Sequence, residues 1–190
     1  MVNKYKYPLV CDTALFEFVE SLEGIRLKPY YDKYGYWTIG VGHNLTTNPL
    51  KNYIKRQFWP PEDEDDPVIS DAEALKRMKK DGLTKQQCYY ILNDDLVEVD
   101  QSLYNKFPRY LGCDSDIRKM ALLYLGFNLG IRGILGFKKF IPAFAKKKYD
   151  IAADELMNSL WYKQVPRAAK CIVHMVRYEE IPPLDDEEEE

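Results

Sequence analysis

The stretch that decides the fold is EGIRLKPYYDKYGYWTIGVGH, residues 23–43. It opens with Glu23, carries Asp32 nine positions later, and places Thr38 six positions beyond that. Between them, short runs of Tyr, Trp, Thr, Ile and Val alternate with glycines and a proline, a pattern typical of short strands joined by tight turns. DKYG, residues 32–35, fits one such turn. We therefore expect a small antiparallel sheet here.

Helices are predicted on both sides of this stretch. Residues 12–23 place apolar side chains at helical spacing, with Asp12 as a candidate N-cap. Further along, Ser70 with Glu73 has the pattern of a capping box that opens a short helix, and a second box opens a longer helix at Thr84.

The rest of the chain also has helical patterns. Residues 116–129 are apolar nearly all round, so this helix is expected to be the buried centre of the larger lobe. Three more helices are predicted at about 137–147, 150–162 and 166–178.

The predicted fold class is α+β, mainly helical, in a single domain with two lobes. A small sheet-bearing lobe spans about residues 24–83 and includes an acidic loop at 60–67. A helical lobe spans about 84–180, and the N-terminal helix, residues 12–23, joins it. The tail, residues 181–190, is acidic and expected to be disordered.

Composition excludes several classes of protein. No run reaches the roughly 20 apolar residues of a membrane span, so stable membrane insertion is not expected. Asp12 and Glu17 interrupt the apolar residues near the N-terminus, so we expect no secretion signal and synthesis in the cytoplasm. The four cysteines form no CxxC pair, so we expect reduced thiols, no metal site and no cofactor.

Charge is unevenly distributed. Residues 62–66 and 185–190 hold 11 of the 30 acidic residues, leaving 27 basic and 19 acidic residues elsewhere. A basic body suits an anionic polymer, either cell wall or nucleic acid. No nucleic-acid-binding motif is present, so a nucleic-acid partner is not predicted. The acidic runs fit solvated charge blocks, and a partner-binding role stays open.

The carboxylates of the opening stretch suit acid–base chemistry. Glu23 falls in the last turn of its helix and faces the negative end of the helix dipole, which disfavours ionisation and suits a general acid. Asp32 lies in a more solvated turn, where a carboxylate stays charged. Two carboxyls in unlike environments are the pair used in glycoside hydrolysis, and Thr38 could hold a water near Asp32. By spacing alone, two solvated surface carboxylates are the commoner explanation.

A family resemblance adds to this reading. The string E-G-x-R-L-x-x-Y-x-D-x-x-G-Y-x-T-I-G-x-G-H closely resembles the active-site signature of the phage-type lysozymes, the endolysin family of the T-even phages. The likeness covers about residues 12–178. It continues, in the family's order, at residues 84–85, 93–95, 127–130, 136–137 and 161–166.

The resemblance implies a lysozyme-like fold with a cleft between two lobes, and an inverting N-acetylmuramidase. Its substrate would be the peptidoglycan glycan strand, cut at the β-1,4 bond between N-acetylmuramic acid and N-acetylglucosamine. Glu23 would be the general acid, Asp32 would assist the water or stabilise the oxocarbenium-like charge, and Thr38 would position the water. The protein would be a monomer, made in the host cytoplasm and released to the wall through a separate holin.

The resemblance also implies supporting residues. Leu45, Phe127 and Asn128 would bind substrate, although the first two could equally be core and Asn128 a helix-terminal polar residue. His43 would form a structural ion pair with Asp95.

Some features depart from the family pattern. The acidic loop at 60–67 is an insertion, which could narrow the cleft, bind a partner or do nothing. Where the family has an arginine that pairs with the catalytic glutamate, this chain has Ala168, preceded by Arg167. One step along a helix turns a side chain by about 100°, which puts an Arg167–Glu23 pair in doubt. The alternative function is a non-catalytic or virion-associated peptidoglycan-binding module, against which the intact Glu23, Asp32 and Thr38 argue.

Overall fold

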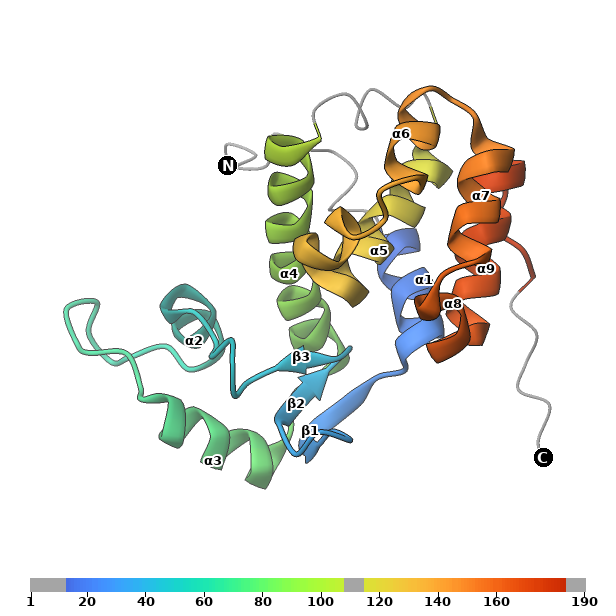
Figure 1. The fold of residues 1–190 in the computed structure, drawn as a ribbon. Helices are drawn as coiled ribbons and strands as arrows, with labels where there is room; N and C mark the ends of the chain where they lie inside the picture. Colours follow the sequence, from blue (N-terminus) through green and yellow to red (C-terminus); the bar gives the residue numbers. More distant parts are fainter. Residues whose placement is uncertain (1–12, 108–114, 184–190) are drawn as a thin grey trace. The chain divides into compact units, whose positions relative to one another are not determined.

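The chain folds mainly into helices, with one small antiparallel sheet (Figure 1). The structure is a computed structural model that describes residues 13–107 and 115–183. Its elements in chain order are α1 (Thr13–Glu23), β1 (Arg26–Tyr31), β2 (Trp37–Gly40), β3 (His43–Asn44), α2 (Asn52–Phe58), α3 (Asp71–Asp81), α4 (Lys85–Lys106), α5 (Asp116–Leu135), α6 (Phe140–Ala145), α7 (Tyr149–Met157), α8 (Leu160–Gln164) and α9 (Pro166–Tyr178). The predicted fold class is confirmed.

Some predictions lie outside the described residues. They concern the N-cap at Asp12, the thiols of Cys11 and Cys113, and the tail from residue 184 onward. Among the helices that the structure does describe, none is both long and apolar enough to cross a membrane.

Contacts divide the chain into two compact units. One unit is Phe16–Asp95, here called the sheet unit. The other combines residues 1–15 with residues 96–190 and is called the helical unit. Helices α1 and α4 each contribute residues to both units.

The sheet unit is built around its three strands, in the order β1-β2-β3. Gly35 makes the predicted turn possible, because its φ of 80° is in the left-handed region that glycine adopts readily. Helix α3 packs against β1, and the apolar core beneath consists of Ile39, Leu50, Ile54, Ala74, Met78, Leu83, Cys88 and Ile91.

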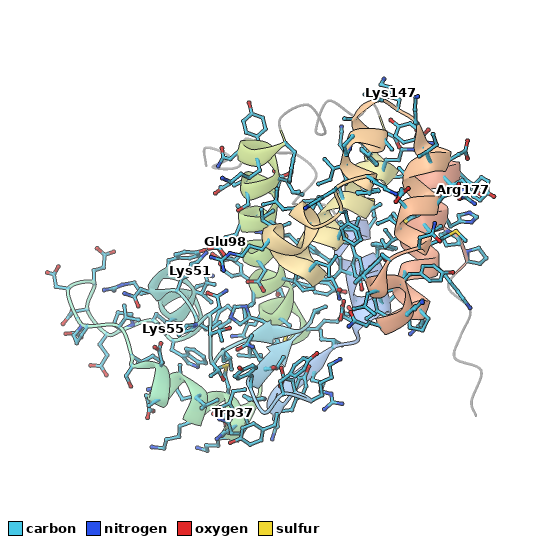
Figure 2. All side chains as sticks on the ribbon, viewed as in Figure 1. Trp37, Lys51, Lys55, Glu98, Lys147 and Arg177 are labelled. Carbon is cyan, nitrogen blue, oxygen red and sulfur yellow. The ribbon has the colours of Figure 1, made fainter. Side chains whose placement is uncertain are left out.

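Two basic residues of α2 organise the segment that follows it. Lys55, almost fully buried, places its Nζ 2.8 Å from Asp71 Oδ1 and so ties α2 to α3 (Figure 2). Arg56 donates from Nη1 and Nη2 to the backbone carbonyls of Glu64 and Asp66, each at 3.0 Å. The acidic loop is therefore held by its main chain.

The helical unit is held by apolar packing. Helix α5 buries an unbroken run, residues 120–126, and α9 packs against α5, α7 and α8. Gly126 lets α4 approach α5 closely, because a Cβ there would lie 2.4 Å from Val99 Cγ1. Arg118, also buried, donates from Nε to the carbonyl of Val176 and from Nη1 to Glu179 Oε2, closing the end of α9.

The helix boundaries confirm some predictions and correct others. Ser70 caps α3 as predicted, its Oγ accepting from the Glu73 N–H at 3.2 Å. The predicted single helix at 150–162 is wrong: α7 ends at Met157, and Ser159 caps a new helix, α8, by accepting from the Tyr162 N–H. Helix α5 runs beyond its predicted end, with a break at Gly130, where φ is 65°.

Candidate active site

Glu23 stands where the first helix gives way to the sheet. It is the last residue of α1, and the next residue, Gly24, has a φ of 75° and donates its N–H to the Glu20 carbonyl at 2.7 Å. The glycine ends the helix and turns the chain into β1. The Glu23 side chain is exposed, so it can meet a substrate.

Asp32 follows β1 and is fixed by backbone donors. Its Oδ1 accepts from the N–H groups of Tyr34 and Tyr36, both at 2.8 Å, and its own carbonyl accepts from the Gly35 N–H at 3.0 Å. Such an Asx turn orients the carboxylate without any help from another side chain. Within the described ranges no donor is bound to Oδ2, which leaves that oxygen to bind water.

Thr38 is buried, at 4% exposed, and its hydroxyl is oriented as well. Oγ1 donates to the Tyr36 carbonyl at 3.2 Å, so its lone pairs can accept a hydrogen bond from a water. Tyr36 therefore links the two residues through its main chain, with its N–H on Asp32 and its carbonyl on Thr38. One residue thus orients a carboxylate and a hydroxyl, two groups that can each accept a hydrogen bond from a water.

A polar cluster fixes the end of α1 against the start of α4. Glu20, one turn before Glu23, accepts from Lys85 Nζ at 2.9 Å and from the Tyr89 hydroxyl. The hydrogen bond to Glu20 raises the pKa of Lys85, so the lysine stays charged. Both partners lie in the first turns of α4, so this cluster holds the end of α1 that carries Glu23 in place within the sheet unit.

A histidine–aspartate contact and a lysine–aspartate ion pair join the sheet region to the middle of α4. His43 is buried, and its Nδ1 lies 2.8 Å from Asp95 Oδ2 and 3.0 Å from Oδ1. Lys51 Nζ lies 2.7 Å from Asp94 Oδ2 (Figure 2). The first is the pair that the resemblance implied, and the second had no sequence signal beyond charge.

The residues implied to bind substrate belong to both units. Leu45 packs on the core of the sheet unit and, with Trp37 and Leu75, lines an apolar pocket of about 230 Å³. Phe127 and Asn128 lie on α5 in the helical unit, both half-buried. Asn128 Oδ1 accepts from the indole Nε1 of Trp161 at 2.9 Å, which gives this side chain a structural contact.

The sequence reasoning assigned no role to Arg26 and Tyr30, although both stand inside the opening motif. The Arg26 guanidinium carbon lies 4.2 Å from the centre of the Tyr30 ring. Burial raises the pKa of Tyr30, the Arg26 charge lowers it, and the charges of Asp32 and Glu23 raise it further. The tyrosine is therefore close enough to feel both carboxylates.

No group of three or more His, Cys, Asp or Glu side chains that could hold a metal ion is found in the part of the chain that the structure describes.

Comparisons with known proteins show which family the chain belongs to. A family model described as "Phage lysozyme" matches residues 20–177. "Probable T4-type lysozyme 1" of Dictyostelium discoideum is 27% identical over 171 residues, which is 86% of this chain and 94% of that protein. "Probable T4-type lysozyme 2" of the same organism is 29% identical over 164 residues, 85% and 92% of the two chains. "Pre-baseplate central spike protein Gp5" of Enterobacteria phage T4 is 24% identical over 166 residues, 86% of this chain but 27% of that protein.

Proposed function

The chain belongs to the phage lysozyme family and is a glycoside hydrolase that acts on peptidoglycan, and on that premise we propose that Glu23, Asp32 and Thr38 carry out the hydrolysis. The observation that carries this proposal is the main-chain link through Tyr36, which pairs an oriented carboxylate with an oriented hydroxyl. Glu23 is anchored in the same unit through the last turn of α1.

The proposed reaction cuts the β-1,4 bond between N-acetylmuramic acid and N-acetylglucosamine. Glu23 gives its proton to the glycosidic oxygen as the bond from that oxygen to the anomeric carbon breaks, and the leaving oxygen keeps the electron pair. A water that donates to Thr38 Oγ1 and to Asp32 attacks the anomeric carbon from the opposite face. The water oxygen forms the new bond to that carbon, keeps one proton as the new hydroxyl group and passes the other proton to Asp32. Inversion follows, and requires the carboxyl groups to be about 6.5–9.5 Å apart with substrate bound.

Three further residues are proposed to bind the glycan strand: Leu45, Phe127 and Asn128. The case for Asn128 is the weakest of the three, because its Oδ1 already accepts a hydrogen bond from Trp161 Nε1. If Phe127→Ala raises KM and leaves the melting temperature unchanged, Phe127 has a role in binding. If the variant lowers the melting temperature and leaves KM unchanged, Phe127 belongs to the core.

The Glu23→Gln variant tests the general acid. Its rate of clearing a suspension of purified peptidoglycan should fall by about 10²–10⁴-fold, because the amide cannot donate the proton. Glu17→Gln is the matched control: it removes a carboxylate from an exposed position of the same helix and should keep the parent rate. Clearance by Glu23→Gln at the parent rate would contradict the assignment.

Product stereochemistry tests the role of Asp32. Proton NMR of a soluble glycan fragment, recorded during hydrolysis, should show the α-anomer of N-acetylmuramic acid appearing first. Asp32→Asn should slow its formation while leaving the melting temperature near that of the parent. A β-anomer as first product would replace the inverting scheme with a retaining one.

We infer that the biological role is host-cell lysis, with the enzyme made as a monomer in the cytoplasm of an infected bacterium and released through a holin. The match to a central spike protein of a phage supports a second candidate, a virion-associated lysozyme. Expression in bacteria separates them. A lysis enzyme should clear the culture only after the membrane is permeabilised and should elute as a monomer, whereas a virion component should copurify with particles.

A further inference from the structure

Tyr31 and Trp37 form an aromatic pair on the hairpin of β1 and β2. They lie opposite each other in the antiparallel ladder, and their ring centres are 3.9 Å apart with 31° between the ring planes. Thr38 follows Trp37 on the same strand, and successive residues of a strand point to opposite faces. The aromatic pair therefore lies on the face of the hairpin opposite to the Thr38 side chain.

Lys79, on α3, covers the other side of the indole. Its Nζ lies 3.7 Å from the centre of the Trp37 ring (Figure 2). At these distances Tyr31 and Lys79 cannot share one face of the indole, so the side chains stack in the order Tyr31, Trp37, Lys79. Because a cation is attracted to the face of an indole, Lys79 holds the ring in place from the side of α3.

The outer ring of this stack is the one that solvent reaches. Tyr31 is 61% exposed, whereas Trp37 is half-buried and also lines the apolar pocket beside α3. The Trp37 N–H donates to Thr46 Oγ1 at 2.9 Å, and its carbonyl accepts from the Leu45 N–H at 2.8 Å. Tyr31 thus presents a flat aromatic face on a support that is already ordered, which lowers the entropy cost of binding a ligand there.

Lysines gather beside the stack at the end of α3. Lys79 and Lys80 belong to the last turn of that helix, and Lys28, on β1, donates from Nζ to the Lys80 carbonyl at 3.2 Å. All three lysines are exposed, and Asp81 is the acid that follows them. The negative end of the helix dipole favours cations here, but it does not require one of them to lie on an indole. These four side chains carry a net positive charge.

An exposed aromatic face beside cations fits a peptidoglycan strand. In β-1,4-linked aminosugars the ring hydrogens point above and below each sugar, which leaves apolar faces that can pack flat on an aromatic ring. The stem peptides of the strand carry carboxylates, which lysines attract. Because the chain acts on peptidoglycan, its own substrate polymer supplies both kinds of group.

We propose that the exposed face of Tyr31, with Lys79 and the lysines beside it, is a second binding site for peptidoglycan. While one strand is cut at the proposed catalytic residues, a neighbouring strand of the wall is held on the face of the hairpin opposite to Thr38. The inference rests on the proposed function for the identity of the polymer, and it adds a site that keeps the enzyme on an insoluble substrate.

Retention on insoluble peptidoglycan tests the site without turnover. In a Glu23→Gln background, Tyr31→Ala should raise the dissociation constant measured by cosedimentation roughly fivefold, because the stacking surface is lost. Tyr31→Phe should bind like the parent, since stacking needs the ring and not the hydroxyl group. Tyr178→Ala is the matched control, because Tyr178 is 60% exposed at the end of α9 in the helical unit. Equal binding by Tyr31→Ala and Tyr178→Ala would overturn the proposal.

Lys79→Gln tests the charged part of the site. It should weaken retention roughly threefold at low ionic strength, and the difference should shrink as salt screens the exposed charges. On peptidoglycan stripped of its stem peptides by an amidase, the effect of Lys79→Gln should shrink while that of Tyr31→Ala persists. Lys76→Gln is the control, because Lys76 is a 79% exposed lysine of the same helix. An equal loss in Lys76→Gln would mean that total charge is the cause and would overturn the role of Lys79.

Substrate size separates this site from the proposed catalytic residues. With Glu23 intact, Tyr31→Ala should raise the KM for insoluble peptidoglycan roughly fivefold and change the KM for a short soluble glycan fragment much less, because the fragment occupies one site at a time. Equal changes on both substrates would place Tyr31 in the catalytic site and overturn the second one. Turnover by Glu23→Gln at the parent rate would overturn the proposed catalytic role instead and leave the retention experiment to decide on Tyr31.

Discussion

The two units of the chain are stabilised in different ways. In the sheet unit, buried polar side chains join the elements, as in the His43–Asp95 and Lys55–Asp71 pairs. In the helical unit, a continuous apolar run on α5 forms the centre, and Arg118 is buried where it closes the end of α9. The unit that carries the candidate acid pair therefore depends on a few specific contacts, and the other depends on close packing.

This contrast follows from what each unit has to hold. The sheet is short, so hydrogen bonds and ion pairs add to the apolar core of its unit in fixing the geometry of the strands. A helix as apolar as α5 is held by close packing, so a change in the volume of one of its buried side chains lowers the stability of the unit. A loss of one polar group should therefore open the sheet unit, and an added methyl should open the helical unit.

Each unit contains a buried cysteine that can report on it separately. Cys88 belongs to the sheet unit and Cys171 to the helical unit, and burial raises the pKa of each thiol to about 11. Both thiols should resist alkylation at neutral pH until their unit opens, since the thiolate is the reactive form. With Cys11 and Cys113 replaced by serine, the two labelling rates measure two local stabilities.

The largest expected effect is that of His43→Asn. It should lower the free energy of unfolding by about 3 kcal/mol, because it leaves the Asp95 carboxylate, 13% exposed, without its partner. Denaturant titration gives the total loss, and labelling should accelerate at Cys88 far more than at Cys171. The His43→Asn/Asp95→Asn double variant should recover part of the loss. Equal acceleration at both thiols would refute separate stabilisation of the units.

Gly126→Ala should cause the next largest loss of stability. The new Cβ meets Val99 Cγ1 at 2.4 Å, so α4 and α5 must separate, at a cost of about 1–3 kcal/mol. Labelling should now accelerate at Cys171. Adding Val99→Ala removes the clash and should restore much of the melting temperature. If the double variant is no more stable than Gly126→Ala, the contact does not limit the packing.

The smallest expected change in stability concerns a buried carboxylate in the otherwise apolar interior of the helical unit. Asp100, on α4, is 4% exposed, and its Oδ2 has no hydrogen-bond partner among the described residues. Burial raises the pKa of this carboxyl above its ordinary value. A raised folded-state value means that the folded chain holds the proton more tightly, so stability is full below the unfolded value and falls as pH rises through the folded one.

Asp100→Asn should therefore stabilise the protein at pH 7 by about 1 kcal/mol and have little effect near pH 3. Thermal unfolding of both proteins across this range measures the difference. A gain that does not change with pH would mean that the charge of Asp100 is not its cause.

Much of the sheet unit could be predicted because its signals are local. Gly35 and the Asp32 turn, the helix end at Gly24 and the cap at Ser70 each follow from neighbouring residues. The helix end and the turn suggested an acid–base pair of Glu23 and Asp32, but by spacing alone surface carboxylates were the commoner explanation, and the family resemblance favoured the catalytic one.

What could not be predicted depends on residues far apart in the chain. The contact of Glu20 with Lys85 and Tyr89 joins positions whose spacing carries no pattern. The break after Met157 was missed because Ser159 fits a helix interior as well as a cap, and only its bond to Tyr162 decides between them.

The contacts of Arg56 decide which mutations the acidic loop can accept during evolution. Its guanidinium binds the carbonyls of Glu64 and Asp66, groups that every amino acid supplies. These two contacts do not depend on the side chains of the loop, whereas the bond from the Asp63 N–H to Asp66 Oδ2 does, so mutation at the other acidic positions can change the charge of the loop without breaking its contacts with Arg56. Both contacts come from one arginine, so replacing Arg56 would remove them together and with them the tolerance of the loop to new side chains.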